Sequence, residues 1–220
     1  MPKIIPFLTE QAIGHIVYMV LALGVFVSCK DNTIEMQEIK QSVATPTLII
    51  PQKNKLEILD SIFTANESYR SIEFDFPVGK PNSKGYYNAQ KFGENNHLGD
   101  DWNGVGGGNS DIGDPIYTIS NGYVSAVKNA GSGWGNVIRV IHSYNNIYYE
   151  SIYAHCDTIF VKENQLIKRG DKIGSIGTAN GAYLAHLHLE IRDQIFMEIG
   201  GGYSTDTKGY VDPTEFIKTH

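Results

Sequence analysis

Seven residues near the C-terminal end alternate strictly between polar and apolar side chains: His186-Leu187-His188-Leu189-Glu190-Ile191-Arg192. Because side chains two apart on a β-strand point the same way, this pattern predicts a strand with its leucines in the core. His186 and His188 then lie on the other face, where both imidazoles can approach one point. A neutral imidazole supplies a lone pair to zinc and also exchanges protons near neutral pH. The segment therefore predicts a strand with a metal or catalytic site; a structural role for the two histidines is the alternative.

Short strands and turns dominate the sequence that precedes this segment. Asn121-Gly122 separates two β-rich runs, residues 115–119 and 123–127, and this arrangement predicts a hairpin. Residues 136–141 and 147–155 form two further strand candidates. A Gly-Asp turn followed by an apolar strand start occurs twice, at residues 113–116 and 170–174, as expected for a domain built from repeated hairpin units.

Helices are expected at the margins of this β-rich region. Leu56, Leu59, Ile62 and Phe63 have helical spacing within residues 53–66, which predicts a short helix docked on the main domain. Asp212-Pro213 predicts a second short helix with proline at its first position. The fold class predicted is all-β: a compact antiparallel sheet or barrel-like domain with minor helices.

Length and composition limit the function classes. The 220 residues allow one domain with appendages, and a net charge of −6 argues against a broad nucleic-acid surface. Two cysteines are too few for a disulfide scaffold. We expect no nucleic-acid partner, and the sequence leaves the oligomeric state open.

The N-terminal region has the features of an export signal. An apolar run at residues 16–27 is too short for an ordinary membrane span but suits a signal peptide. It ends in Ser28-Cys29, as bacterial lipoprotein leaders do, so we expect lipidation at Cys29; an unprocessed apolar helix is the alternative. The predicted organisation is a signal peptide at 1–28, a tether with a short helix at 29–71, and the main domain at 72–220.

Two other segments carry chemically competent side chains. His97 and Asp101 offer a nitrogen and an oxygen ligand within a glycine-containing loop, and Asp100 competes with Asp101 on chemistry alone. Together with a histidine of the later strand they would give zinc three protein ligands and an open position for water. His155 ends a strand candidate and suits a ligand, a proton-transfer group or a core residue; the adjacent Cys156 is expected to be a small buried thiol.

The order of these pieces along the chain is more specific than any one of them. His97-Leu98-Gly99-Asp100-Asp101 has the form H-x-G-x-D, and Tyr153-Ala154-His155 and His186-Leu187-His188 follow it. This series, over roughly residues 96–213, resembles the lysostaphin/LytM-type zinc endopeptidases, which cleave bacterial peptidoglycan peptides. The resemblance implies the duplicated-hybrid-motif fold, with a groove across its sheet. One departure from the family pattern is a glycine-rich insertion at residues 103–112.

The resemblance also implies roles for individual residues. It implies Zn²⁺ held by His97, Asp101 and His188, which settles the choice between Asp100 and Asp101. His155 and His186 match the two active-site histidines of the family that are not ligands. One would accept a proton from water, and the other would orient that water or stabilise the developing oxyanion. Tyr117, Tyr149 and Tyr183 are candidates for the groove, although packing in the β domain is the alternative for each.

The function predicted from the sequence is zinc-dependent hydrolysis of peptide cross-links in peptidoglycan. The protein would be exported to the cell envelope of a diderm bacterium and held at a membrane by a lipid anchor. The principal alternative is an inactive, wall-associated binding or regulatory module on the same fold. A sugar- or peptide-binding β domain without metal is a third hypothesis.

Overall fold

The computed structural model describes residues 52–131 and 133–220. The predicted leader, Cys29 and the tether up to residue 51 lie outside the described residues. Among those that are described, no helix has the length and apolar character needed to cross a bilayer.

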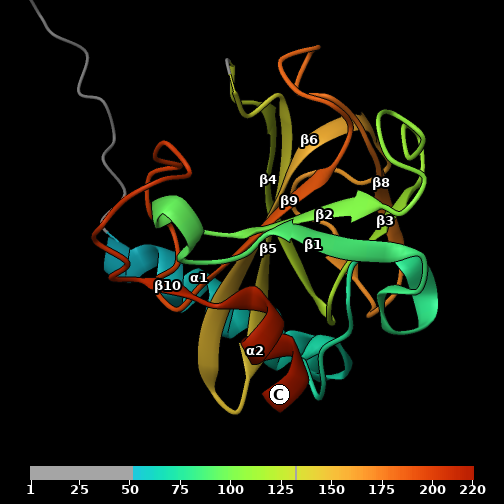
Figure 1. Cartoon of the computed structure of the whole chain (residues 1–220). Helices are drawn as coiled ribbons and strands as arrows, with labels where there is room; N and C mark the ends of the chain where they lie inside the picture. Colours follow the sequence, from blue (N-terminus) through green and yellow to red (C-terminus); the bar gives the residue numbers. More distant parts are fainter. Residues whose placement is uncertain (1–51, 132) are drawn as a thin grey trace, which may run out of the picture. The chain divides into compact units, whose positions relative to one another are not determined.

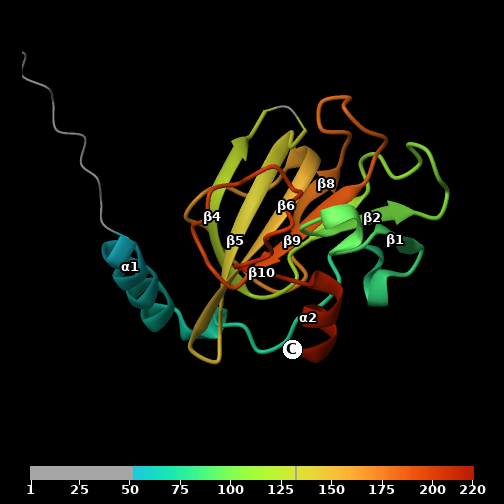
Figure 2. The same ribbon diagram turned by 60° about the vertical axis from the view of Figure 1, so that its left-hand side comes forward.

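Within the described residues, ten strands form one sheet (Figures 1 and 2). The strands are β1 (Tyr86–Gln90), β2 (Asp100–Gly104), β3 (Pro115–Tyr117), β4 (Gly122–Asn129), β5 (Asn136–Tyr144), β6 (Ile147–Ile159), β7 (Leu166–Ile167), β8 (Lys172–Ile176), β9 (Leu187–Arg192) and β10 (Tyr210–Val211). The helices are α1 (Gln52–Ala65) and α2 (Pro213–Thr219), with short helical turns at Glu67–Tyr69, Gly79–Ser83 and Glu94–Asn96. The predicted all-β class with marginal helices is confirmed.

The sheet is antiparallel and follows the order β1-β2-β9-β6-β5-β4-β7. Figure 2 shows β4, β5, β6 and β9 side by side, with the β1–β2 pair beyond β9. Strand β9 is thus a central strand with neighbours on both sides. Its Leu187, Leu189 and Ile191 side chains are fully buried in the main hydrophobic core, as the alternation predicts.

Both marginal helices form where the sequence predicts them. Leu59 and Phe63 of α1 pack with Ile141 and Ile195 in a second apolar cluster, so the helix is docked as expected. At α2, the Asp212 side chain accepts a hydrogen bond from the Glu215 backbone N–H at 3.0 Å. This N-cap and the proline after it fix the start of the helix.

The predicted hairpin at Asn121-Gly122 is wrong. Strand β3 pairs with β8, and β4 pairs with β5 and β7. A two-residue type I′ turn needs positive φ at both central residues, and among the described residues with positive φ neither Asn121 nor Gly122 appears. The Asn121 side chain instead bonds the Arg70 carbonyl and the Arg169 N–H, which ties the start of β4 to distant segments. The two segments that begin with a Gly-Asp turn, residues 113–116 and 170–174, lead into the paired strands β3 and β8.

A histidine in the core makes folding stability depend on pH. His142 is fully buried between the Asn121 carbonyl and the Ser151 hydroxyl, each 2.7 Å from a ring nitrogen. Burial lowers the pKa of His142 to about 4. The unfolded chain therefore takes up a proton between about pH 6.5 and pH 4 that the folded chain does not.

We expect the contribution of His142 to be fully present above about pH 6.5 and lost as the pH falls toward 4. The loss amounts to about 3 kcal/mol of unfolding free energy, at about 1.4 kcal/mol per pH unit of pKa difference. Urea unfolding at several pH values would measure it for the wild type and for His142→Gln. The wild-type curve is expected to fall more steeply than the variant's in this window; parallel curves would contradict the assignment.

Candidate metal centre

The candidate site lies where β2, β9 and β6 run side by side. Asp101 of β2 is the direct cross-strand partner of His188 on β9, and His188 is the partner of Ala154 on β6. Cross-strand partners project to the same face of a sheet, so Asp101 and His188 meet there. His97 precedes β2 and is held by an isolated bridge to Tyr203.

The three predicted ligands converge on one point. His97 Nε2 lies 3.0 Å from His188 Nδ1 and 3.4 Å from Asp101 Oδ1, and His188 Nδ1 lies 2.9 Å from Asp101 Oδ1. Ligands about 2.0–2.1 Å from a zinc ion in a tetrahedron lie about 3.3–3.4 Å apart. Two imidazole nitrogens and one carboxylate oxygen are also a donor set that zinc accepts. The residues therefore fit a zinc ion, and among the described residues they form the candidate metal-binding group.

Asp100 points elsewhere. Its carboxylate accepts hydrogen bonds from the Phe92 N–H at 3.0 Å and from the Thr214 hydroxyl at 2.6 Å. Asp100 is thus used to attach α2 and the loop before β2. Of the two aspartates that the sequence offers, Asp101 is the one that the structure brings to the histidines.

Electrostatics make this point favourable for positive charge. Burial lowers the pKa of His188, but hydrogen bonds with Asp101 and Glu190 outweigh burial and raise it to about 9. Burial raises the pKa of Asp101, yet the His188 hydrogen bond and the neighbouring histidines bring it below its usual value. Burial lowers the pKa of His97 although Asp101 opposes the shift. Asp101 and Glu190 thus lie on opposite sides of the His188 ring, and both favour positive charge there.

His155 and His186 stand beside this group. Their ring centroids are 4.6 Å apart, and His155 lies 5.5 Å from the His188 ring. His155 Nδ1 faces the Trp134 carbonyl at 3.2 Å, and His186 Nδ1 faces the Leu184 carbonyl at 2.8 Å. A carbonyl only accepts hydrogen bonds, so each ring carries its proton on Nδ1 and keeps Nε2 as an acceptor. His186 Nε2 lies 3.7 Å from Asp101 Oδ1.

The backbone of His155 is strained. Strand β6 pairs with β9 up to Ala154 and with β8 from Cys156 onward, so it changes partner at His155. His155 has φ of 62°, a conformation that costs a non-glycine residue about 1–3 kcal/mol. Burial lowers its pKa to about 3, with the neighbouring His188 and His186 acting in the same direction. The adjacent Cys156 is a buried free thiol, as predicted.

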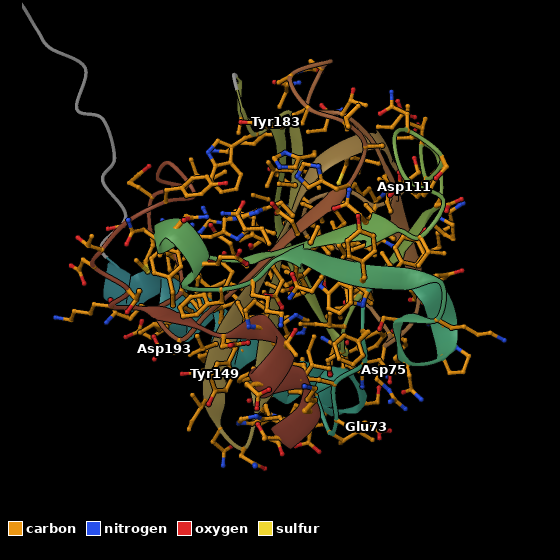
Figure 3. The ribbon with its side chains drawn as sticks, viewed as in Figure 1. Glu73, Asp75, Asp111, Tyr149, Tyr183 and Asp193 are labelled. Atoms are coloured by element: carbon orange, nitrogen blue, oxygen red, sulfur yellow. The ribbon has the colours of Figure 1, made fainter. Side chains whose placement is uncertain are left out.

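The five predicted side chains line one groove with a volume of about 560 Å³. The remaining lining residues are Gln90, Ala130, Gly133, Trp134, Tyr183, Ile199, Gly200, Gly201 and Tyr203. Tyr183 belongs to the groove, whereas Tyr149 packs against Phe216 near the opposite end of the sheet (Figure 3). Tyr117 packs under the Lys80 ammonium group. Packing is thus the role of two of the three candidate tyrosines.

Most of the groove wall carries no motif that marks it in the sequence. Trp134 packs edge-on against His188, its carbonyl orients His155, and its indole N–H donates to the Gly200 carbonyl at 3.0 Å. Trp134 stands in a glycine-rich turn, and a tryptophan in such a turn is a weak sequence signal for a groove residue. Residues 199–201 and Tyr203 carry no motif, so nothing local points to them.

Gly99 explains the glycine of the H-x-G-x-D segment. A Cβ at this position would lie 2.5 Å from the Leu189 carbonyl oxygen and 2.9 Å from His188 Cε1. The absence of a side chain lets the loop approach β9 closely enough to bring His97 and Asp101 to His188.

We expect Gly99→Ala to lower the free energy of unfolding by about 1–3 kcal/mol, the usual effect of overpacking. Gly201→Ala is the matched control, because a Cβ there meets nothing within 4 Å. That substitution should change stability by less than about 0.5 kcal/mol. Equal denaturation midpoints for the two variants would refute the close-approach argument.

Part of the chain is similar to known proteins. Residues 101–205 match Peptidase family M23. The chain is 41% identical over 80 residues to Lipoprotein NlpD of Yersinia enterocolitica, covering 36% of this chain and 78% of that protein. It is 40% identical over 92 residues to the murein hydrolase activator NlpD of Salmonella dublin, covering 39% of this chain and 23% of that protein.

A further relative is the peptidoglycan DD-endopeptidase ShyB of Vibrio cholerae, 38% identical over 80 residues, 36% of this chain and 18% of that protein. The match thus spans less than a quarter of the Salmonella and Vibrio relatives. The catalytic domain of lysostaphin from Staphylococcus simulans is similar in structure, with 23% identity and a TM-score of 0.43 over 70% of this chain and 95% of that one. From the matched domain and the Yersinia relative, the chain belongs to Peptidase family M23.

Proposed function

We propose that the protein is a zinc-dependent endopeptidase that hydrolyses peptide cross-links in bacterial peptidoglycan. The observation that supports this proposal most strongly is which side chains lie next to the three ligand atoms. Two histidines with acceptor nitrogens stand beside them in the same groove, which is more than a structural metal site requires. The name of the Vibrio relative supports the substrate class.

His97, Asp101 and His188 would hold the zinc ion. A zinc ion with three protein ligands supplies a water of lowered pKa, about 7, and polarises the carbonyl to be attacked. Trp134, Tyr183 and Tyr203 give the groove flat side chains against which a peptide chain can lie.

His155 and His186 would take part in proton transfer. Nε2 of one would accept a proton from the attacking water, while the other would orient the water or, once protonated on Nε2, stabilise the oxyanion. The Trp134 and Leu184 carbonyls accept hydrogen bonds from Nδ1–H of His155 and His186. Each ring therefore keeps a lone pair on Nε2, which proton transfer requires. Such general acid–base assistance commonly contributes about 10²–10⁴-fold to the rate.

We further propose that the protein works in the cell envelope of a diderm bacterium. A signal peptide at residues 1–28 would direct export. A lipid anchor on Cys29 and a tether with a short helix at 29–71 would then hold the domain at 72–220 at the membrane. The name of the Yersinia relative, a lipoprotein, supports an anchored form. Metabolic labelling with a fatty acid tests this, and equal labelling of wild type and Cys29→Ser would refute lipidation.

A second candidate function is activation of a separate murein hydrolase without catalysis. The name of the Salmonella relative favours it. Purified zinc-loaded protein incubated with cross-linked muropeptides separates the two: new peptide termini support the endopeptidase. Intact muropeptides, together with stimulation of an added murein hydrolase, would support the activator.

A further inference from the structure

A buried carboxylate lies behind His188, on the side of the ring away from His97 and Asp101. Glu190 is fully buried, and its Oε1 lies 3.3 Å from His188 Nε2. Its other oxygen, Oε2, accepts hydrogen bonds from Arg192 Nε at 3.0 Å and Nη2 at 2.7 Å. The three side chains follow one another along the polar face of β9.

Arg192 continues this chain of contacts to the wall of the groove. It is fully buried, and it donates to the Glu198 carbonyl at 2.9 Å and the Ile199 carbonyl at 2.7 Å. Ile199 lines the groove. A continuous hydrogen-bonded path thus runs from His188 through Glu190 and Arg192 to the segment that faces the site.

A second buried pair on the same part of the sheet provides an internal comparison. Arg139 donates to Glu150 at 3.0 and 2.6 Å, and also to the Met197 carbonyl at 2.9 Å. Glu150 accepts from the Phe196 N–H at 3.3 Å. This pair holds the same segment as Arg192 does, but its hydrogen bonds do not include His188. Anchoring the groove wall therefore does not by itself require a carboxylate at His188.

We infer that Glu190 is a positioning residue that accepts the Nε2–H of His188 and thereby leaves Nδ1, on the side of His97 and Asp101, as the nitrogen that would ligate zinc. A ring nitrogen with a lone pair is a ligand, and the hydrogen bond made by the other nitrogen decides which one that is. Arg192 fixes the orientation of the carboxylate and connects it to the groove wall. This inference rests on the proposed zinc site.

The test is the zinc affinity of the full chain, measured by competition with a chromophoric chelator. We expect Glu190→Gln to weaken zinc binding about 10–100-fold, the usual effect of losing such an outer contact. Glu190→Asp keeps the charge that pairs with Arg192, so this variant should fold. Its side chain is shorter by one methylene, so it should bind zinc more weakly than the wild type. Glu150→Gln is the matched control, since it breaks a comparable buried pair and should leave zinc affinity unchanged.

A spectroscopic measurement separates positioning from general destabilisation. In zinc-loaded protein labelled with ¹⁵N on histidine, the wild-type His188 ring is expected to carry its proton on Nε2. The Glu190 variants should shift or broaden that resonance, and Glu150→Gln should not.

Wild-type affinity and unchanged His188 resonances in both Glu190 variants would overturn the inference while leaving the zinc site intact. Equal weakening by Glu150→Gln would also overturn it, because the effect would then come from the groove wall. If wild-type protein binds no zinc at all, the proposed function itself fails, and this inference fails with it.

Discussion

Replacing His188 with alanine is expected to abolish zinc binding and, with it, peptidoglycan hydrolysis. His188 Nδ1 lies within 3.0 Å of both other ligand atoms, and the residue is almost completely buried at the centre of the group. Its loss removes one of three ligands, so we expect affinity to fall by more than the about 10–100-fold typical of outer contacts. Elemental mass spectrometry measures the zinc content, and an assay of muropeptide turnover measures the hydrolysis.

His220→Ala is the matched control for this substitution. His220 lies after α2 and stacks on Phe216 with a 4.1 Å centroid distance. That variant should retain zinc content and turnover. A His188→Ala protein with wild-type zinc occupancy and turnover would refute the ligand role assigned to His188.

Substitution of the two remaining groove histidines is expected to separate chemistry from metal binding. We expect His155→Asn and His186→Ala to lower kcat by about 10²–10⁴-fold, because each removes an Nε2 acceptor beside the ligand group. Asparagine suits position 155, since it tolerates the positive φ that His155 adopts. Zinc content should stay at the wild-type level in both variants.

Turnover and zinc content must therefore be measured together. A His155 or His186 variant that keeps wild-type kcat would remove that residue from the proton-transfer step. A variant that loses its zinc would instead show that the histidine supports the metal site. The His220→Ala protein again provides the reference for both values.

The polar side of the site could be predicted because it is local in sequence. Alternation in residues 186–192 fixes which side chains of β9 share a face, and the observed burial of Leu187 and Leu189 in the core follows from it. The N-cap at Asp212 and the buried thiol of Cys156 are likewise decided by neighbouring residues or by chemical type.

Other features depend on contacts between distant segments. Asn121-Gly122 has the composition of a hairpin turn, yet the Asn121 side chain satisfies the Arg70 carbonyl and the Arg169 N–H. These long-range bonds override the local turn preference. The burial of Arg192 is similarly hidden, because the Glu198 and Ile199 carbonyls that accept its hydrogen bonds reach it only in the folded chain.

Zinc-dependent cleavage can be measured by incubating the zinc-loaded wild-type chain with cross-linked muropeptides and determining the product masses by mass spectrometry. We expect one zinc ion per chain and products that have gained one water at a peptide bond of the cross-link. A chelator should stop the reaction, and added zinc should restore it. A folded, zinc-loaded protein that leaves every cross-link intact would refute the proposed endopeptidase activity.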